Sequence, residues 1–231
     1  MTERDWFGEV DFDLLRAACE WLSEEKKNKR KLRLWACACC HRLGTFLTDK
    51  RSLKALDVAE RLAEGLADKA EVDAARKAAK LVPQVRVGGK GTPAEWAASV
   101  PVILLHPSAG EFTQTATIRA AIAMAESGVT TREDEERVQF ALLRDVFGNP
   151  FQKIKFDKRY RTDTVLSLVR TMYDSRDFSA MPILADALQD AGCDNDDILN
   201  HCRDADATHV RGCWVVDLVR EGSDATLKDR R

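Results

Sequence analysis

The sequence has few of the residues that interrupt helices. Its 231 residues include only 12 glycines and 6 prolines, and segments with an apolar residue at every third or fourth position follow one another along most of the chain. Few breakers and short connections favour helices that pack side by side. We therefore predict an all-α fold, an antiparallel multi-helix array that could contain stacked helix pairs, with at most a minor extended segment.

Long hydrophobic runs are also absent. The longest apolar run, residues 99–105 (SVPVILL), is far shorter than the ~18 residues that a membrane-spanning helix needs. The sequence opens with MTERDWFGEVDFD, which is acidic and lacks the apolar core of a signal peptide. We expect a cytoplasmic protein that makes no contact with a membrane.

The two signs of charge are nearly balanced. The 36 lysines and arginines are offset by 38 aspartates and glutamates, for a formal net charge of -2, so there is no general electrostatic attraction to nucleic acid. The strongest basic run, residues 26–33 (KKNKRKLR), contains no aromatic residue that could stack on a base. It is typical of a solvated turn at the start of a helix, and we expect no nucleic-acid partner.

Helical periodicity is clear early in the chain. In residues 11–23 the apolar side chains recur at spacings of three and four, which predicts an amphipathic helix. Residues 30–47 are apolar around more than half of the helical circumference. That pattern predicts a helix buried on two sides.

The chain is predicted to form one helical domain over residues 1–231. Residues 83–92 (PQVRVGGKGT) contain one proline and three glycines and are the best internal linker. A division into residues 1–82 and 93–231 is therefore the alternative.

Two local features complete the predicted organisation. Thr92, Pro93 and Glu95 are typical of an N-cap, a first helical position and a capping-box partner, so a helix should begin at Pro93. Residues 151–163 are the one plausible extended piece, which we interpret as a surface connector.

Seven cysteines, an odd number, lie mostly inside the apolar helical patterns. In a reducing compartment they are thiols, and a disulfide framework is not expected. Cysteine packs as a small hydrophobic residue, so Cys19, Cys37, Cys39 and Cys40 are predicted to fill space between helices.

The C-terminal stretch HCRDADATHVRGCWVVDL, which begins at residue 201, is dense in histidine and cysteine and allows a metal site. If its second half is helical, His209 and Cys213 lie one turn apart, and Cys37 and His41 have the same spacing. Two such pairs facing each other would form a tetrahedral zinc site. The alternative ligands are Cys40, His201 and Cys202.

Two further interpretations of this stretch remain. Cys202 or Cys213 could act as a nucleophile with His201 or His209 as its base, although no known signature of a cysteine enzyme surrounds either thiol. The other interpretation is a structural clasp, in which arginines bind helix C-terminal carbonyls and carboxylates. Its residues are Asp186, Arg203, Arg211, Trp214 and Asp217.

Several blocks together resemble a family of paralogous proteins found in planctomycete bacteria. The blocks are KLRLWACACC, FGNPF, PILADALQDAGC, HCR and HVRGCWVVDL, in this order. The resemblance covers most of the chain and implies a self-contained, intracellular helical domain. It supplies no substrate, cofactor or catalytic residue. At the position of His41 the family usually has an arginine, which argues against a required metal ligand there.

The sequence contains no catalytic signature, which favours a helical protein-interaction or scaffolding module whose partner is another protein. No cofactor is expected in that case. The alternative is a zinc-binding or thiol-dependent enzyme domain organised around the C-terminal histidines and cysteines.

Overall fold

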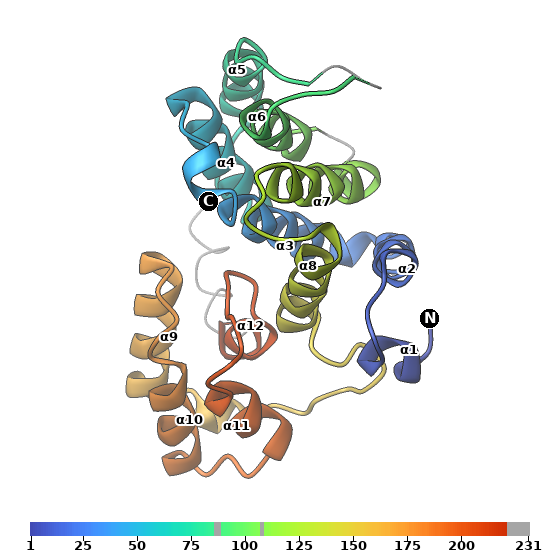
Figure 1. Cartoon of the computed structure of the whole chain (residues 1–231). Coiled ribbons are helices and arrows are strands. Elements are labelled where there is room, and N and C mark those ends of the chain that lie inside the picture. Colours follow the sequence, from blue (N-terminus) through green and yellow to red (C-terminus); the bar gives the residue numbers. More distant parts are fainter. Residues whose placement is uncertain (86–88, 107–108, 221–231) are drawn as a thin grey trace. The chain divides into compact units, whose positions relative to one another are not determined.

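The computed structural model describes residues 1–85, 89–106 and 109–220 (Figure 1). Over these residues the chain forms twelve α-helices and three short 3-10 helices, and no strand. The helices pack against one another in a multi-helix array. The prediction of an all-α fold is confirmed.

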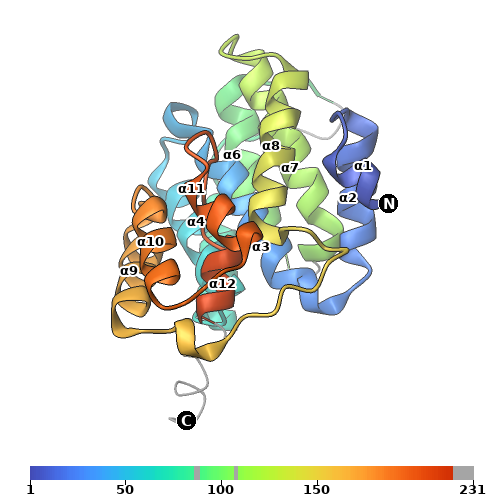
Figure 2. The ribbon, with the colours of Figure 1, turned by 90° about the horizontal axis from the view of Figure 1, so that it is seen from below.

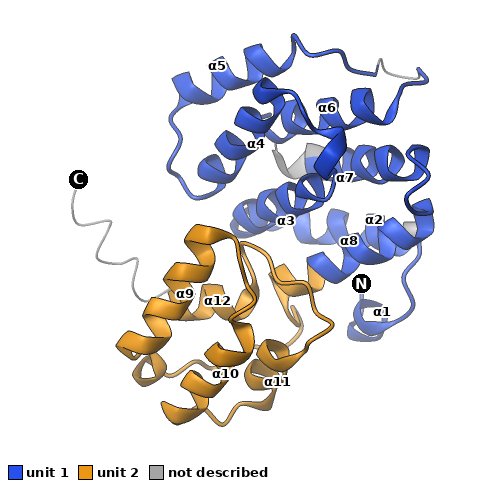
Figure 3. Ribbon diagram, turned by 60° about the vertical axis from the view of Figure 1, so that its left-hand side comes forward, with its two compact units in different colours: residues 1–142 blue, residues 143–231 orange. Residues whose placement is uncertain are grey.

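The chain divides into two compact units, residues 1–142 and 143–231 (Figure 3). The division falls within helix α8 (Arg132–Phe147), so the last turn of α8 belongs to the second unit. The predicted linker, residues 83–92, lies inside the first unit, and its residues 86–88 are outside the described residues.

The first unit contains seven complete helices and most of α8 (Figures 1 and 2). Its helices are α1 (Glu3–Phe7), α2 (Phe12–Ser23), α3 (Lys29–His41), α4 (Lys50–Ala63), α5 (Lys69–Ala79), α6 (Pro93–Leu104) and α7 (Ala109–Glu126), with 3-10 turns at Lys26–Asn28 and Gly44–Phe46. The predicted start at Pro93 is confirmed, because the Thr92 hydroxyl accepts from the Glu95 N–H while the Glu95 carboxylate accepts from the Thr92 N–H.

Helix α3 lies at the centre of this unit, in contact with α4, α6 and α7. Its side chains from Leu34 to Cys40 are all buried, as the apolar pattern of this segment predicts. The Trp35 indole N–H donates to the Gln139 carbonyl at 2.8 Å. Three of the seven buried cysteines lie on this helix, and the small size of cysteine allows neighbouring helices to approach closely.

The second unit contains the end of α8 and four helices: α9 (Asp163–Ser175), α10 (Met181–Asp190), α11 (Asp196–Arg203) and α12 (Trp214–Arg220). Their apolar faces form one core, which includes Val169, Leu184, Ile198 and Val215. The predicted connector, residues 151–163, has no strand and contains a 3-10 turn at Lys158–Tyr160. None of the helices in the described part of the chain combines the length and apolar character needed to cross a bilayer.

One buried ion pair offers a test of the first unit. The Arg42 guanidinium donates two hydrogen bonds to Glu135, at 2.9 and 2.8 Å, and the Glu135 side chain is fully buried. We expect Arg42→Met to lower the free energy of unfolding by about 3 kcal/mol, because the substitution leaves a buried carboxylate without its partner. Urea unfolding followed by circular dichroism measures this loss.

Arg51→Met is the matched control, because the ion pair of Arg51 with Asp49 lies at the surface. It should cost less than about 1 kcal/mol. Equal losses for the two arginine variants would contradict the interpretation.

Candidate metal centre

Asp145 comes from the last turn of α8. The helix ends two residues later, at Phe147, and the chain turns at Gly148, whose φ of 64° lies in the left-handed region that favours glycine. The Asp145 side chain is 4% exposed. A carboxylate is electrostatically disfavoured in the last turn of a helix, so its burial there requires specific partners.

His201 comes from α11. This helix is capped by Asn195, whose side chain accepts from the Ile198 N–H at 3.1 Å, and it buries Ile198, Leu199 and Cys202 in the core of the second unit. His201 precedes the buried Cys202 and its side chain is 17% exposed. The core-facing side of α11 therefore fixes the direction in which His201 points.

His209 and Cys213 come from the loop between α11 and α12. The prediction that they share one helical turn is wrong, because α12 begins only at Trp214 and Gly212 has a φ of 91°. The loop turns back on itself, with the Cys213 N–H donating to the Val210 carbonyl at 2.9 Å. This turn brings the two side chains together without a helix.

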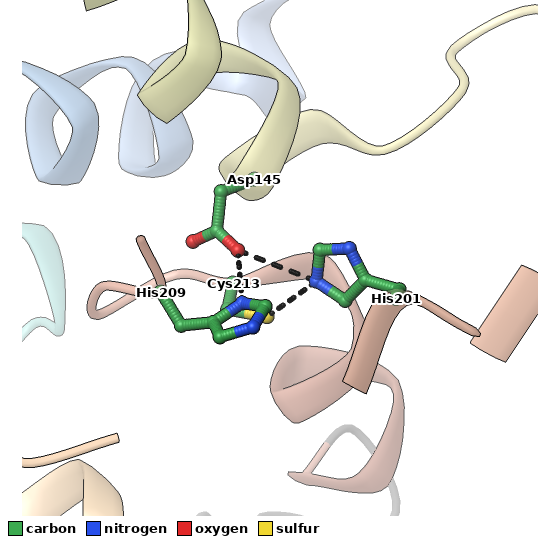
Figure 4. A group of neighbouring side chains, drawn as sticks. All are labelled: Asp145, His201, His209 and Cys213. Atoms are coloured by element: carbon green, nitrogen blue, oxygen red, sulfur yellow. Dashed lines mark hydrogen bonds and ion pairs between the residues drawn. The ribbon is translucent and has the colours of Figure 1, made fainter. Parts of the chain in front are cut away.

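The four side chains converge on one point (Figure 4). One ligand atom from each of them lies within 4.8 Å of the other three. The Asp145 Oδ1 atom is 2.7 Å from His209 Nδ1 and 3.3 Å from His201 Nε2, and His201 Nε2 is 3.2 Å from Cys213 Sγ. In the described part of the chain, no other group of three or more histidine, cysteine, aspartate or glutamate side chains is arranged in this way.

Hydrogen bonds fix the carboxylate and leave one imidazole nitrogen unpaired. The second oxygen of Asp145 accepts from the Val210 N–H at 3.0 Å. The His209 side chain is 5% exposed, and its Nε2 atom is buried and makes no hydrogen bond with the protein. Buried polar atoms are almost always satisfied, so this nitrogen is suited to bind a ligand.

Burial and charge set the protonation of the acidic groups. Burial alone would raise the pKa of Asp145, but the hydrogen bonds and charges of His201 and His209 outweigh it and hold that pKa below its usual value. Burial, and then the negative charge of Asp145, raise the pKa of the Cys213 thiol well above its usual value. At neutral pH, and without a metal ion, Cys213 is therefore a thiol facing a carboxylate.

This geometry differs from that of a thiol active site. In a cysteine–histidine–aspartate triad, the carboxylate and the nucleophile contact opposite nitrogens of the imidazole. Here Asp145 and Cys213 both lie beside the same nitrogen of His201, Nε2. His209 faces Asp145 through Nδ1, but its Nε2 atom makes no hydrogen bond with the thiol. Cys213 is also fully buried. A metal centre fits these contacts better than a nucleophilic site.

The zinc ligands predicted from the sequence separate into two groups. His209, Cys213 and the alternative ligand His201 belong to the converging group. Cys37, Cys40 and His41 do not: they lie on α3 in the first unit, where His41 Nε2 is 2.6 Å from Glu60 Oε1. Cys202 is buried in the core of the second unit and is also outside the group.

Asp145 is the member of the group that sequence reasoning missed. It lies 56 residues before His201 in the chain, and no periodicity links the two. The available signal was a carboxylate in the last turn of a predicted helix, just before Gly148, where the helix dipole disfavours negative charge. Such a residue needs a partner from elsewhere in the fold.

The residues predicted to form a clasp all lie in the second unit, and one of them, Trp214, lies beside His201. The Arg203 guanidinium lies 3.0 Å from an Asp186 carboxylate oxygen and links α11 to α10. The Arg211 Nε–H donates to the Tyr173 carbonyl at 2.8 Å, near the end of α9. The Trp214 ring lies 5.0 Å from the His201 ring. Asp217 is buried on α12, 3.8 Å from Arg220.

Comparison with protein-family models, curated proteins and solved structures finds no match for this chain.

The buried thiols give the first test of this centre. Burial raises the pKa of Cys202 to about 12 and raises that of Cys213 as well. We expect iodoacetamide at neutral pH to alkylate both in the folded protein on the order of a thousandfold more slowly than in the urea-unfolded chain, because the reactive species is the thiolate. Peptide mass spectrometry after timed quenching measures the two rates. Rapid labelling of Cys213 in the folded protein would instead support the interpretation of Cys213 as an active-site nucleophile.

Proposed function

We propose that the second unit binds a zinc-class divalent ion at the group formed by His201, His209 and Cys213 together with Asp145. The observation that carries the proposal is the convergence of their four ligand atoms within 4.8 Å. Imidazole nitrogen, thiolate sulfur and carboxylate oxygen are the usual zinc ligands, at distances of about 2.0–2.3 Å. Two ligands of a tetrahedral ion with such bonds lie roughly 3.3–3.7 Å apart, close to the 3.2 Å between His201 Nε2 and Cys213 Sγ.

The burial of the group supports a firmly held ion. Three of the four side chains are at most 5% exposed, so most of the ion's surroundings would be protein, with His201 on the more exposed side. The unpaired His209 Nε2 would gain a partner, and the ion would replace the proton of the Cys213 thiol.

Metal binding would join three segments that are distant in the sequence: the end of α8, the last turns of α11 and the loop before α12. The helices of this unit are short, between 7 and 13 residues after α8. Isolated helices of that length are marginal in water. The free energy of metal binding adds directly to the stability of the folded unit.

The interaction or scaffolding role, with another protein as partner, stays a prediction. It is compatible with a metal-stabilised helical domain. A cytoplasmic location, the lack of a nucleic-acid partner and the resemblance to the planctomycete family also stay predictions.

Metal content is the direct test. Protein purified without a polyhistidine tag, dialysed against zinc and then against buffer, should retain about one zinc per chain by elemental analysis. Cys213→Ser should abolish this retention, because the hydroxyl is a far weaker ligand than the thiolate.

Cys202→Ser provides the matched control. Cys202 and Cys213 are both fully buried in the core of the second unit, but only Cys213 belongs to the converging group. Cys202→Ser should keep the zinc. A wild-type chain that retains no zinc would refute the proposed function.

Stability provides an independent test. At free zinc one hundred times the Kd, binding should stabilise the folded protein by about 2.7 kcal/mol. Thermal unfolding should therefore shift upward by several degrees on adding zinc and return on adding a chelator. The Cys213→Ser variant should show no shift, and an equal shift in that variant would place the ion elsewhere.

A further inference from the structure

Resting on the proposed function, we propose that Asp145 does not bind the ion but positions His209, so that the protein supplies three ligands and the fourth position takes a small exogenous ligand. The three ligands are His209 Nε2, His201 Nε2 and Cys213 Sγ. The exogenous ligand is water or a small monoanion.

The distance between Asp145 and His209 carries the first step. Their Oδ1 and Nδ1 atoms are 2.7 Å apart. Two zinc ligands at that separation would subtend an angle of about 80° at the ion, compared with about 109° for a tetrahedron. The same distance is ordinary for a charge-assisted N–H···O hydrogen bond. The pair is therefore a hydrogen bond, with Nδ1–H as the donor.

The second step follows from the imidazole tautomer. A neutral imidazole that donates from Nδ1 carries its lone pair on Nε2. In His209 that atom is buried and makes no hydrogen bond with the protein. A carboxylate behind one nitrogen and a metal ion at the other is a recurrent arrangement, in which the carboxylate fixes the ring and raises its basicity.

Asp145 is itself held in place for this role. Its second oxygen accepts from the Val210 N–H at 3.0 Å, one residue after His209. The carboxylate thus binds the side chain of His209 and the backbone that follows it. This arrangement fixes the ring relative to the loop that also carries Cys213.

The remaining two ligands lie on the same side of the carboxylate. His201 Nε2 is 3.2 Å from Cys213 Sγ, near the separation expected of two ligands on one ion. The His201 and His209 rings are 4.7 Å apart at their centroids and tilted by 72°, so they do not stack face to face. Figure 4 shows both rings and the thiol grouped beneath the Asp145 carboxylate.

Three protein ligands leave one position of a tetrahedral zinc ion for water or another small ligand. Zn²⁺ bound by one thiolate and two neutral imidazoles carries a net charge of +1. Asp145 lies behind His209 and balances this charge. A small oxygen or nitrogen donor, neutral or singly charged, therefore suits the fourth position. Among the three ligands, His201 is the most exposed, at 17%. An exogenous ligand would therefore approach beside His201.

The test uses the full chain loaded with Co²⁺ in place of zinc, because cobalt reports its coordination through its visible spectrum. Sodium azide should change that spectrum in a saturable way, as expected for a ligand that enters the fourth position. Asp145→Asn should still bind one Co²⁺ per chain, with an affinity lower by roughly 10- to 100-fold. His209→Ala should lower the Co²⁺ affinity much further, because it removes a ligand.

Asp217→Asn is the control for removal of a buried carboxylate from the same unit, since Asp217 is 3% exposed and outside the converging group. It should leave the Co²⁺ affinity unchanged. If Asp145→Asn abolishes binding as fully as Cys213→Ser does, or if azide leaves the spectrum unaltered, Asp145 is the fourth ligand and the inference is wrong. A wild-type chain that binds no metal would instead refute the proposed function.

A measurement on the wild-type chain keeps the inference testable if Asp145→Asn does not fold. Long-range proton–nitrogen correlation spectra of the ¹⁵N-labelled, zinc-loaded protein identify the protonated nitrogen of each histidine. His209 should keep its proton on Nδ1 and bind zinc through Nε2. Zinc on His209 Nδ1 would overturn the assignment of Asp145.

Discussion

The second unit depends on the buried carboxylate of Asp145. It lies in the last turn of α8, where the helix dipole is unfavourable to negative charge, and burial adds a desolvation cost. Two histidines and one backbone N–H compensate for both. Because His209 and Val210 belong to the loop before α12, the position of this charge fixes where the C-terminal part of the unit can pack.

Gly148 and Trp214 make that packing close. A Cβ atom on Gly148 would lie 2.9 Å from the Trp214 Cγ atom, so the end of α8 can approach the Trp214 ring only because residue 148 has no side chain. The Trp214 ring lies 5.0 Å from that of His201. The FGNP turn thus follows Asp145 closely and lies against Trp214, whose ring is next to that of His201, so packing connects two sequence blocks that have no local relation.

Most of the helices could be predicted because their signals are local. The Thr92 capping box and the apolar face of α3 are each contained within a few turns of chain. The helix expected around His209 and Cys213 does not form there because Gly212 adopts a positive φ before α12 begins. Spacing alone could not show that turn, and it could not show that Cys37 and His41 belong to the other unit.

The site was predictable only in part, because sequence patterns show local spacing but not contacts between distant segments. His201, His209 and Cys213 are close in sequence, so their density is visible, whereas Asp145 reaches them through the packing of the folded unit. The Nδ1 atom of His209 is hydrogen-bonded to Asp145, whereas the Nε2 atom on the other side of the ring makes no hydrogen bond. A purely structural role for this group would not require an unpaired nitrogen at His209 Nε2. The buried Nε2 atom of His209, which makes no hydrogen bond and lies in a group with a second imidazole and a thiol, is the feature on which the proposed metal site depends.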